Sequence, residues 1–184
     1  MSKKASPEQP SKAPVGAVWS APVAVGDVPE AGRRVDLVAN APIREAIAKA
    51  AGLAALPRLE AKFDLTRLGA DGLRVAGRVS ATIVQNCVVT LEPIESEVDE
   101  PIDLLFLPDT AAALDAAGLQ PTGVDPPESL RGGAADLGAV ATEFLLLGIE
   151  PYPRKPGAVF DAPPADDPAS HPFAALAALK KSEN

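Results

Sequence analysis

Cys87 and His171 are the single cysteine and the single histidine of the chain, so a thiol–imidazole pair or a mixed Cys/His zinc site would need both. A catalytic thiol needs a base within hydrogen-bonding reach, and a structural zinc site needs four ligands. His171 falls in a tail rich in proline and aspartate, far along the chain from Cys87. The sequence therefore favours neither chemistry, and we predict no catalytic residues, no metal ligands and no cofactor.

Other motifs of catalysis are also missing from the sequence. No two glycines are separated by one residue, no glycine precedes a lysine, and there is no Gly-x-Ser-x-Gly, which excludes three common phosphate-binding or nucleophile motifs. The carboxylates Glu95, Glu97, Asp99, Glu100 and Asp103 favour the solvated side of a strand, with a metal site or an acid–base pair as the alternative. We therefore expect a protein that is not an enzyme.

The charge balance limits how the chain can bind nucleic acid. It has 25 acidic and 17 basic residues and a formal net charge of −8. Binding to phosphates depends on a local surplus of Lys and Arg. Any RNA contact must therefore come from a local patch, or through a protein partner that is itself basic.

The compartment is indicated by the same composition. One cysteine cannot form an internal disulfide, which suits a reducing cytoplasm. Lys3, Lys4 and Lys12 are not followed by the apolar run of a signal peptide. The longest strongly apolar stretch, residues 144–149, is far shorter than the ~20 residues of a membrane helix. We expect a cytoplasmic protein with no membrane partner.

Hydrophobic periodicity predicts short strands and one helix near the start of the chain. Small and apolar residues alternate over residues 19–25, and Pro22 favours an edge strand because proline lacks an N–H. Residues 33–38 form a candidate second strand. Asn40 then caps a helix with apolar residues at helical spacing, which stops at Gly52.

Longer alternating segments predict an antiparallel sheet. Residues 59–65 alternate apolar and charged side chains, and Asp71-Gly72 offers a turn into the next strand. Odd positions of residues 73–91 then form a mostly apolar face that includes Cys87. This alternation is much longer than the usual strand of about 5–6 residues, so we expect bending at Gly77 or a bulge near Gln85-Asn86. A return strand follows the turn at Glu92-Pro93 and carries Val98, Ile102, Leu104 and Phe106.

The remaining segments predict a covering helix, a loop and two tails. Residues 108–133 indicate a flexible acidic loop, and Asp136 caps a helix whose apolar stripe should cover the open face of the sheet. Residues 1–15 are predicted to be a disordered lead, and residues 158–184 a Pro/Asp-rich tail with a short C-terminal helix. The fold class is α+β: one domain over residues 16–157, with a curved antiparallel sheet or partly open barrel, two covering helices and disordered tails.

Two blocks of sequence carry a family resemblance. Residues 84–93 read Val-Gln-Asn-Cys-Val-Val-Thr-Leu-Glu-Pro, and an acidic strand after them ends in Leu-Leu-Phe-Leu-Pro. Downstream, Asp-Leu-Gly at residues 136–138 precedes a helix and the exit Pro-Tyr-Pro-Arg-Lys-Pro-Gly at residues 151–157. In order and spacing these blocks resemble the YceD family of large ribosomal RNA accumulation proteins. The likeness covers roughly residues 17–158, and the ending at residues 173–176 is similar to tails of the alphaproteobacterial branch.

The resemblance implies a role in accumulating the RNA of the large ribosomal subunit and in assembling that subunit, and no known reaction. Many members carry Cys-x-Arg-Cys-Leu where this chain has Cys87-Val88-Val89-Thr90-Leu91. The missing second cysteine removes the metal or redox role of a cysteine pair. Cys87 is then interpreted as a small core residue.

The first candidate for RNA or partner contact is a set of cations on the sheet. Arg74 and Arg78 share one face of the long strand about 13 Å apart, comparable to two phosphate steps, and Lys62 and Arg67 of the preceding strand are expected to join them. The alternative is that these arginines pair across strands with residues such as Glu60 or Asp64.

Two further candidates lie after the second helix. Arg154 and Lys155 stand between prolines, whose restricted backbone presents both charges at low entropic cost. The alternative is that the two cations complement the negative end of the dipole of the preceding helix. Phe173, Leu176 and Leu179 of the tail are candidates for docking, either into a groove on a partner or back onto the domain itself.

Two functions from different classes follow. The first is a non-enzymatic assembly factor that binds ribosomal RNA or a large-subunit ribosomal protein. The second is an acidic interaction or chaperone-like module for a basic client unrelated to ribosomes, with residues 108–133 as its client-binding loop. The sequence does not predict the oligomeric state.

Overall fold

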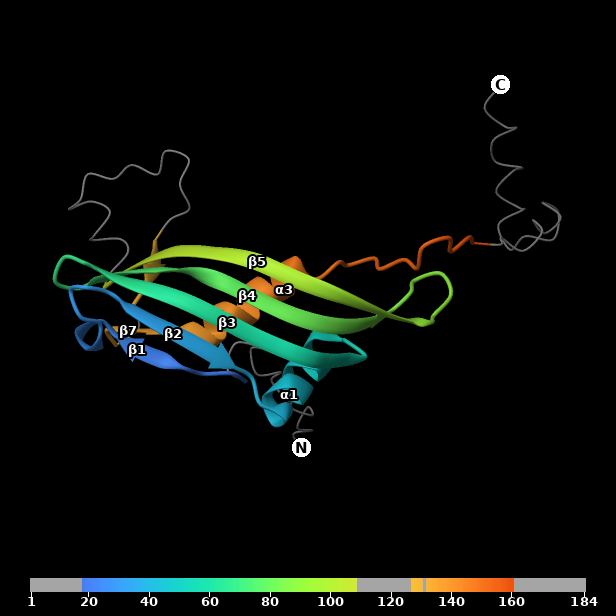
Figure 1. Ribbon diagram of the computed structural model, residues 1–184, viewed down its shortest axis with the longest axis horizontal. Helices are drawn as coiled ribbons and strands as arrows, with labels where there is room; N and C mark the ends of the chain where they lie inside the picture. The colour runs from blue at the N-terminus through green and yellow to red at the C-terminus, as the bar shows by residue number, and fades with distance from the viewer. Residues whose placement is uncertain (1–17, 109–126, 131, 161–184) are drawn as a thin grey trace, which may run out of the picture.

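A computed structural model describes residues 18–108, 127–130 and 132–160 of the chain. Within these residues the fold is α+β, with an open five-stranded sheet of order β2-β3-β4-β5-β6 and a separate pair, β1-β7. Figure 1 shows the large sheet as a long twisted ribbon, with α3 along one face and α1 at one end. The elements are β1 (Pro22–Ala24), a 3-10 turn (Val25–Asp27), β2 (Arg33–Val38), α1 (Ala41–Ala51), β3 (Ala55–Leu68), β4 (Gly72–Asn86), β5 (Pro93–Leu107), β6 (Glu128–Ser129), β7 (Ala134–Asp136) and α3 (Leu137–Gly148).

The three long strands confirm the predicted antiparallel meander. β3 pairs with β4 from Leu68 opposite Gly72, and β4 pairs with β5 from Asn86 opposite Pro93. Apolar side chains alternate into one face of the sheet, as period-two patterning requires. The loop between β3 and β4 is shifted from the predicted Asp71-Gly72 turn, because Gly69 is the residue with left-handed φ (+64°) and Gly72 already belongs to β4.

The buried face of the sheet is covered as expected. Leu137, Val140, Ala141 and Leu145 of α3 are buried, and the helix packs against β4 and β5. α1 packs against β3 and begins and ends where predicted: Asn40 Oδ1 accepts from Ile43 N at 3.1 Å, and the C-cap Gly52 has φ of +71°. These helices close one side of the core and leave the other face of the sheet to solvent. The largest fully buried side chains of the core include Phe63, Leu65, Leu73 and Ile83.

Asp136 confirms its predicted role as the N-cap of α3 and does more than that. Its Oδ1 accepts from the N–H groups of Gly138 and Ala139, and its two oxygens also accept from Ala21 N (2.8 Å) and Ser20 Oγ (2.6 Å). Partial burial raises the pKa of Asp136, but the hydrogen bonds outweigh it, so that the pKa is lowered on balance. One carboxylate thus ties the start of α3 to the segment that leads into β1.

The irregularity predicted near Gln85-Asn86 is elsewhere. The register between β3 and β4 shifts between Ala55 and Arg58, so the extra residue lies in β3. A proline at position 57 explains this choice, because proline cannot donate to the ladder and is tolerated at bulges. Gly77 is instead a place of close approach, where an added Cβ would overlap the carbonyl oxygen of Lys62.

β4 is also shorter than the sequence alternation predicted. The pattern continues to Leu91, but β4 ends at Asn86 and residues 88–90 form a turn. Val89 N and Thr90 N donate to the sulfur of Cys87, and Leu91 N donates to Cys87 O. Val88 N donates to Pro153 O, so none of these groups continues the ladder. Cys87 is therefore buried in a turn and not in a strand.

Residues 108–133, predicted as a loop, contain regular structure at their end. β6 pairs in parallel with β5, Phe106 opposite Glu128, and Leu130 N donates to Leu107 O. β7 follows directly and pairs with β1. Residues 1–17, 109–126 and 161–184 lie outside the described residues, and with them the predicted lead, most of the acidic loop and the C-terminal helix.

Candidate functional site

The solvent-facing side of the sheet carries the candidate cations Arg74 and Arg78 in ion pairs. The Nε and Nη2 atoms of Arg74 donate to the two carboxylate oxygens of Asp103 at 2.9 and 2.8 Å. Arg78 Nη1 lies 2.9 Å from Asp99 Oδ2. These hydrogen bonds lower the pKa of both aspartates. Both arginines are thus neutralised by β5, and cross-strand pairing describes them, although the partners are not Glu60 or Asp64.

Lys62 and Arg67 do not complete a basic patch with them. Lys62 lies on the same face, opposite Arg78 in the β3–β4 register, but Asp36 stands opposite it on β2. Arg67 has the opposite parity: its Nη2 donates to Ala70 O at 3.0 Å, and its Nε is buried. The four expected cations therefore do not share one face of the sheet. The positive charge of the three on the solvent-facing side is offset by carboxylates on β2 and β5.

The turn that follows β4 directs several backbone N–H groups at one buried sulfur atom. The buried sulfur of Cys87 accepts hydrogen bonds from the backbone N–H groups of Val89, Thr90 and Lys155, each at 3.4 Å. The pKa of Cys87 is lowered to about 6, first by the N–H of Lys155 and next by the hydroxyl and N–H of Thr90. Three N–H dipoles aimed at one sulfur favour its thiolate form.

The proline-rich exit from α3 forms one wall of this turn. Val88 N donates to Pro153 O at 2.9 Å, and Gln85 Nε2 donates to Glu150 O at 2.9 Å. Lys155 Nζ bonds Glu92 Oε2 at 2.9 Å, which lowers the pKa of Glu92. Residues 85–92 and 150–155, far apart in the chain, are thereby held side by side.

Four side chains on these two segments point outward. Val88, Leu91 and Tyr152 are 45%, 76% and 71% exposed, and Arg154 is exposed with no ion pair to any described residue. Leu91 has φ of +60°, which among the described residues no other non-glycine shares. We call this set, Val88, Leu91, Tyr152 and Arg154, the turn–exit surface. Of the two predicted exit cations, Lys155 is paired and Arg154 remains available.

No pattern in the sequence indicates how these two segments meet. Residues 84–93 and 151–157 each carry part of the family resemblance. The alternation through Leu91 predicts a strand for most of the first, and the second is identified only as the proline-rich exit after the helix. The only local signal was the run of prolines, which favours an extended backbone able to lie along a neighbouring segment. Phe173, Leu176 and Leu179, the tail-docking candidates, lie outside the described residues.

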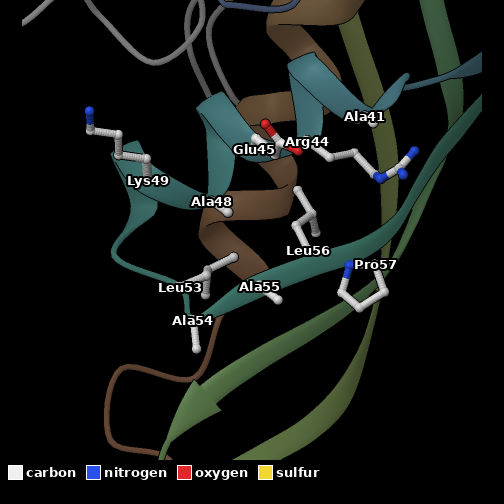
Figure 2. Close-up of a pocket in the computed structure, with 10 residues that line it drawn as sticks. All are labelled: Ala41, Arg44, Glu45, Ala48, Lys49, Leu53, Ala54, Ala55, Leu56 and Pro57. Carbon is white, nitrogen blue, oxygen red and sulfur yellow. The ribbon is translucent and has the colours of Figure 1, made fainter.

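A second feature that the sequence did not indicate is a groove between α1 and the start of β3. Its volume is about 530 Å³, and Figure 2 shows Leu56 between the helix and the strand, with Arg44, Glu45 and Lys49 on the helix. Ala48, Leu53 and Leu56 are buried and form its apolar part. The groove holds no group of polar side chains that converge on one point.

Neither described helix is long and apolar enough to cross a membrane. Across residues 18–108, 127–130 and 132–160, no three His, Cys, Asp or Glu side chains are grouped as a metal site would require.

The fold and the site define an α+β protein built on an open sheet that is covered on one face, with a partly apolar surface where the Cys87 turn meets the exit from α3. The chain matches the family model described as "Large ribosomal RNA subunit accumulation protein YceD" over residues 75–180, and it belongs to this family. That range includes the Cys87 turn and the exit segment, while α1 and its groove precede it. No curated protein and no solved structure matches the chain significantly.

Proposed function

We propose that this protein is a non-enzymatic factor of the cytoplasm that promotes accumulation of large-subunit ribosomal RNA by binding RNA or a ribosomal protein during subunit assembly. The observation that carries the proposal is the family match over residues 75–180, whose description names this RNA. The fold is consistent with binding, since one whole face of a long sheet and the turn–exit surface are open to solvent.

The test is depletion of the protein followed by measurement of the ratio of large to small ribosomal RNA. We expect the ratio to fall, and to recover when the wild-type chain is supplied again. Complementation with Arg74→Ala/Arg78→Ala tests the sheet face: because both arginines are paired with Asp103 and Asp99, we expect this variant to restore the ratio. An unchanged ratio on depletion would refute the proposal.

A second candidate function is supported by the charge of −8: an acidic module that shields a basic client unrelated to ribosomes. The test of this function removes the predicted client-binding loop without disturbing the sheet. Replacing residues 109–126 by a Gly/Ser linker of the same length removes the acidic side chains and keeps the crossover that the parallel pairing of β6 with β5 needs. Loss of client binding with an unchanged RNA ratio would favour this function, whereas a reduced RNA ratio would favour the first.

A further inference from the structure

Most of the exposed large apolar side chains on the described surface come from two segments of the chain. Six of the nine large apolar side chains with high exposure lie in residues 88–91 and 147–160, and the other three are spread over β2, β3 and β5. The hydrogen bond from Val88 N to Pro153 O joins these two segments. Gathered apolar side chains at the surface of a folded domain mark sites of interaction with other molecules. The six are Val88, Leu91, Leu147, Tyr152, Val159 and Phe160.

The surface is rigid where it is apolar. Cys87 Sγ accepts hydrogen bonds from three backbone N–H groups, and Lys155 Nζ donates to Glu92. Pro151 and Pro153 restrict the backbone on either side of Tyr152. A side chain presented from such a frame loses little conformational entropy when a partner covers it. The frame needs no further contribution from Leu91 or Tyr152, whose side chains extend into solvent.

Leu91 gives a separate indication of use. Its left-handed backbone is unfavourable for a residue with a Cβ, and its side chain, 76% exposed, recovers little of that cost by burial. Strained residues of this kind are concentrated at binding and catalytic sites. The sequence keeps a large apolar side chain at a position where glycine would suit the backbone better.

The charges around the surface distinguish between an RNA partner and a protein partner. Lys155 is neutralised by Glu92, and Glu150 accepts from Tyr152 N beside it, so Arg154 is the single cation of the surface without an ion pair to a described residue. Binding to RNA phosphates needs a surplus of cations, which this surface lacks. Tyr and Arg are instead residue types enriched at protein–protein interfaces, and the exposed Leu91 adds apolar area beside them.

We propose that the turn–exit surface docks a protein of the large ribosomal subunit, which places an apolar side chain against Leu91 and Tyr152 and offers a carboxylate to Arg154. This inference rests on the proposed function and narrows it from RNA or protein to protein.

The experiment uses the immobilised full-length chain and two purified probes: the proteins extracted from large ribosomal subunits, and the deproteinised RNA of the same subunits. We expect wild type to retain one discrete ribosomal protein and no RNA. Leu91→Asp and Tyr152→Ala should each weaken binding of that protein about 30-fold or more, as removal of an interface hot spot does. Arg154→Glu should weaken it about tenfold.

Val38→Asp is the matched control. Val38 is 71% exposed, like Leu91, but lies on β2 at the opposite edge of the sheet. This variant should bind as wild type does. Equal loss in Val38→Asp and Leu91→Asp would overturn the proposal, as would retention of RNA that Leu91→Asp abolishes, a wild-type chain that retains no ribosomal protein, or a homodimer that Leu91→Asp dissociates.

An error in the proposed docking surface and an error in the proposed function would give different results in cells depleted of the protein. A Leu91→Asp chain that fully restores the RNA ratio would refute the docking surface and leave the proposed function standing. A ratio unaffected by depletion would refute the proposed function itself.

Discussion

Replacing Leu91 by alanine and by glycine should reverse the usual order of stability of these two variants. Both changes remove the same exposed side chain, which is 76% accessible, so each loses only about 0.5 kcal/mol of burial, a quarter of the value for a fully buried leucine. The difference between the two variants therefore isolates the backbone.

The backbone at this position has φ of +60°. A residue with a Cβ pays about 1–2 kcal/mol in this region, and glycine does not. Glycine in turn loses about 0.5–1 kcal/mol more backbone entropy than alanine on folding. We therefore expect Leu91→Gly to be more stable than Leu91→Ala by about 0.5–1 kcal/mol.

The assay is urea unfolding of the full-length variants, with the free energies compared at equal slope. Val38 supplies the reference pair, since it is similarly exposed but lies in strand β2 without positive φ. There glycine should be less stable than alanine by about 0.5–1 kcal/mol. If Leu91→Gly were also the less stable of its pair, the strain at position 91 would be refuted, and with it one support for the docking surface. Both Leu91 variants should lose binding to the ribosomal protein, so Leu91→Gly separates stability from function.

Three further predictions concern the frame of the domain. Asp136→Ala should lower the free energy of unfolding by about 1–2 kcal/mol through loss of the α3 N-cap, as measured by urea unfolding; a change under a few tenths would contradict the capping role. Gly77→Ala should destabilise by about 1–3 kcal/mol because its Cβ overlaps the Lys62 carbonyl, whereas Gly26→Ala, which meets no atom within 4 Å, should be neutral in the same assay. Cys87→Ala tests the thiolate. The folded pKa of about 6 lies below the unperturbed 9.0, so the unfolded chain binds more protons between these values and the thiol's contribution to stability rises with pH. The stability difference between wild type and Cys87→Ala should grow from about pH 6 to about pH 9 under reducing conditions, and a constant difference would show that the thiol is not ionised.

Local signals in the sequence predicted the elements whose ends are set by neighbouring residues. Asn40 and Gly52 defined α1, because an N-cap side chain and a left-handed C-cap act within one turn of the helix. Asp136 defined the start of α3 for the same reason. Period two identified the long strands, since one buried face forces the alternation.

Features that depend on distant parts of the chain could not be read in this way. The alternation through Cys87 to Leu91 predicts a strand, but the structure has a turn there. Lys155 N, 68 residues away in the chain, donates to the Cys87 sulfur and stabilises this turn. The ion pairs of Arg74 and Arg78 depend on the register between β4 and β5. Periodicity does not determine this register, because a shift of two residues keeps the same side chains on the buried face. β6 and β7 are too short to show a period.

The pairing of β1 with β7 sets an order of events during translation. Ser20 and Asp136 are separated by 116 residues, which a ribosome takes about 6–23 s to add. For that interval Trp19, Val23 and Val25, all buried in the finished protein, have no β7 or α3 to cover them. The nascent chain therefore emerges with this apolar segment uncovered and acquires the cover only after β7 and α3 have been synthesised. By this topology, the uncovered segment makes the nascent chain a candidate client for chaperones at the tunnel exit.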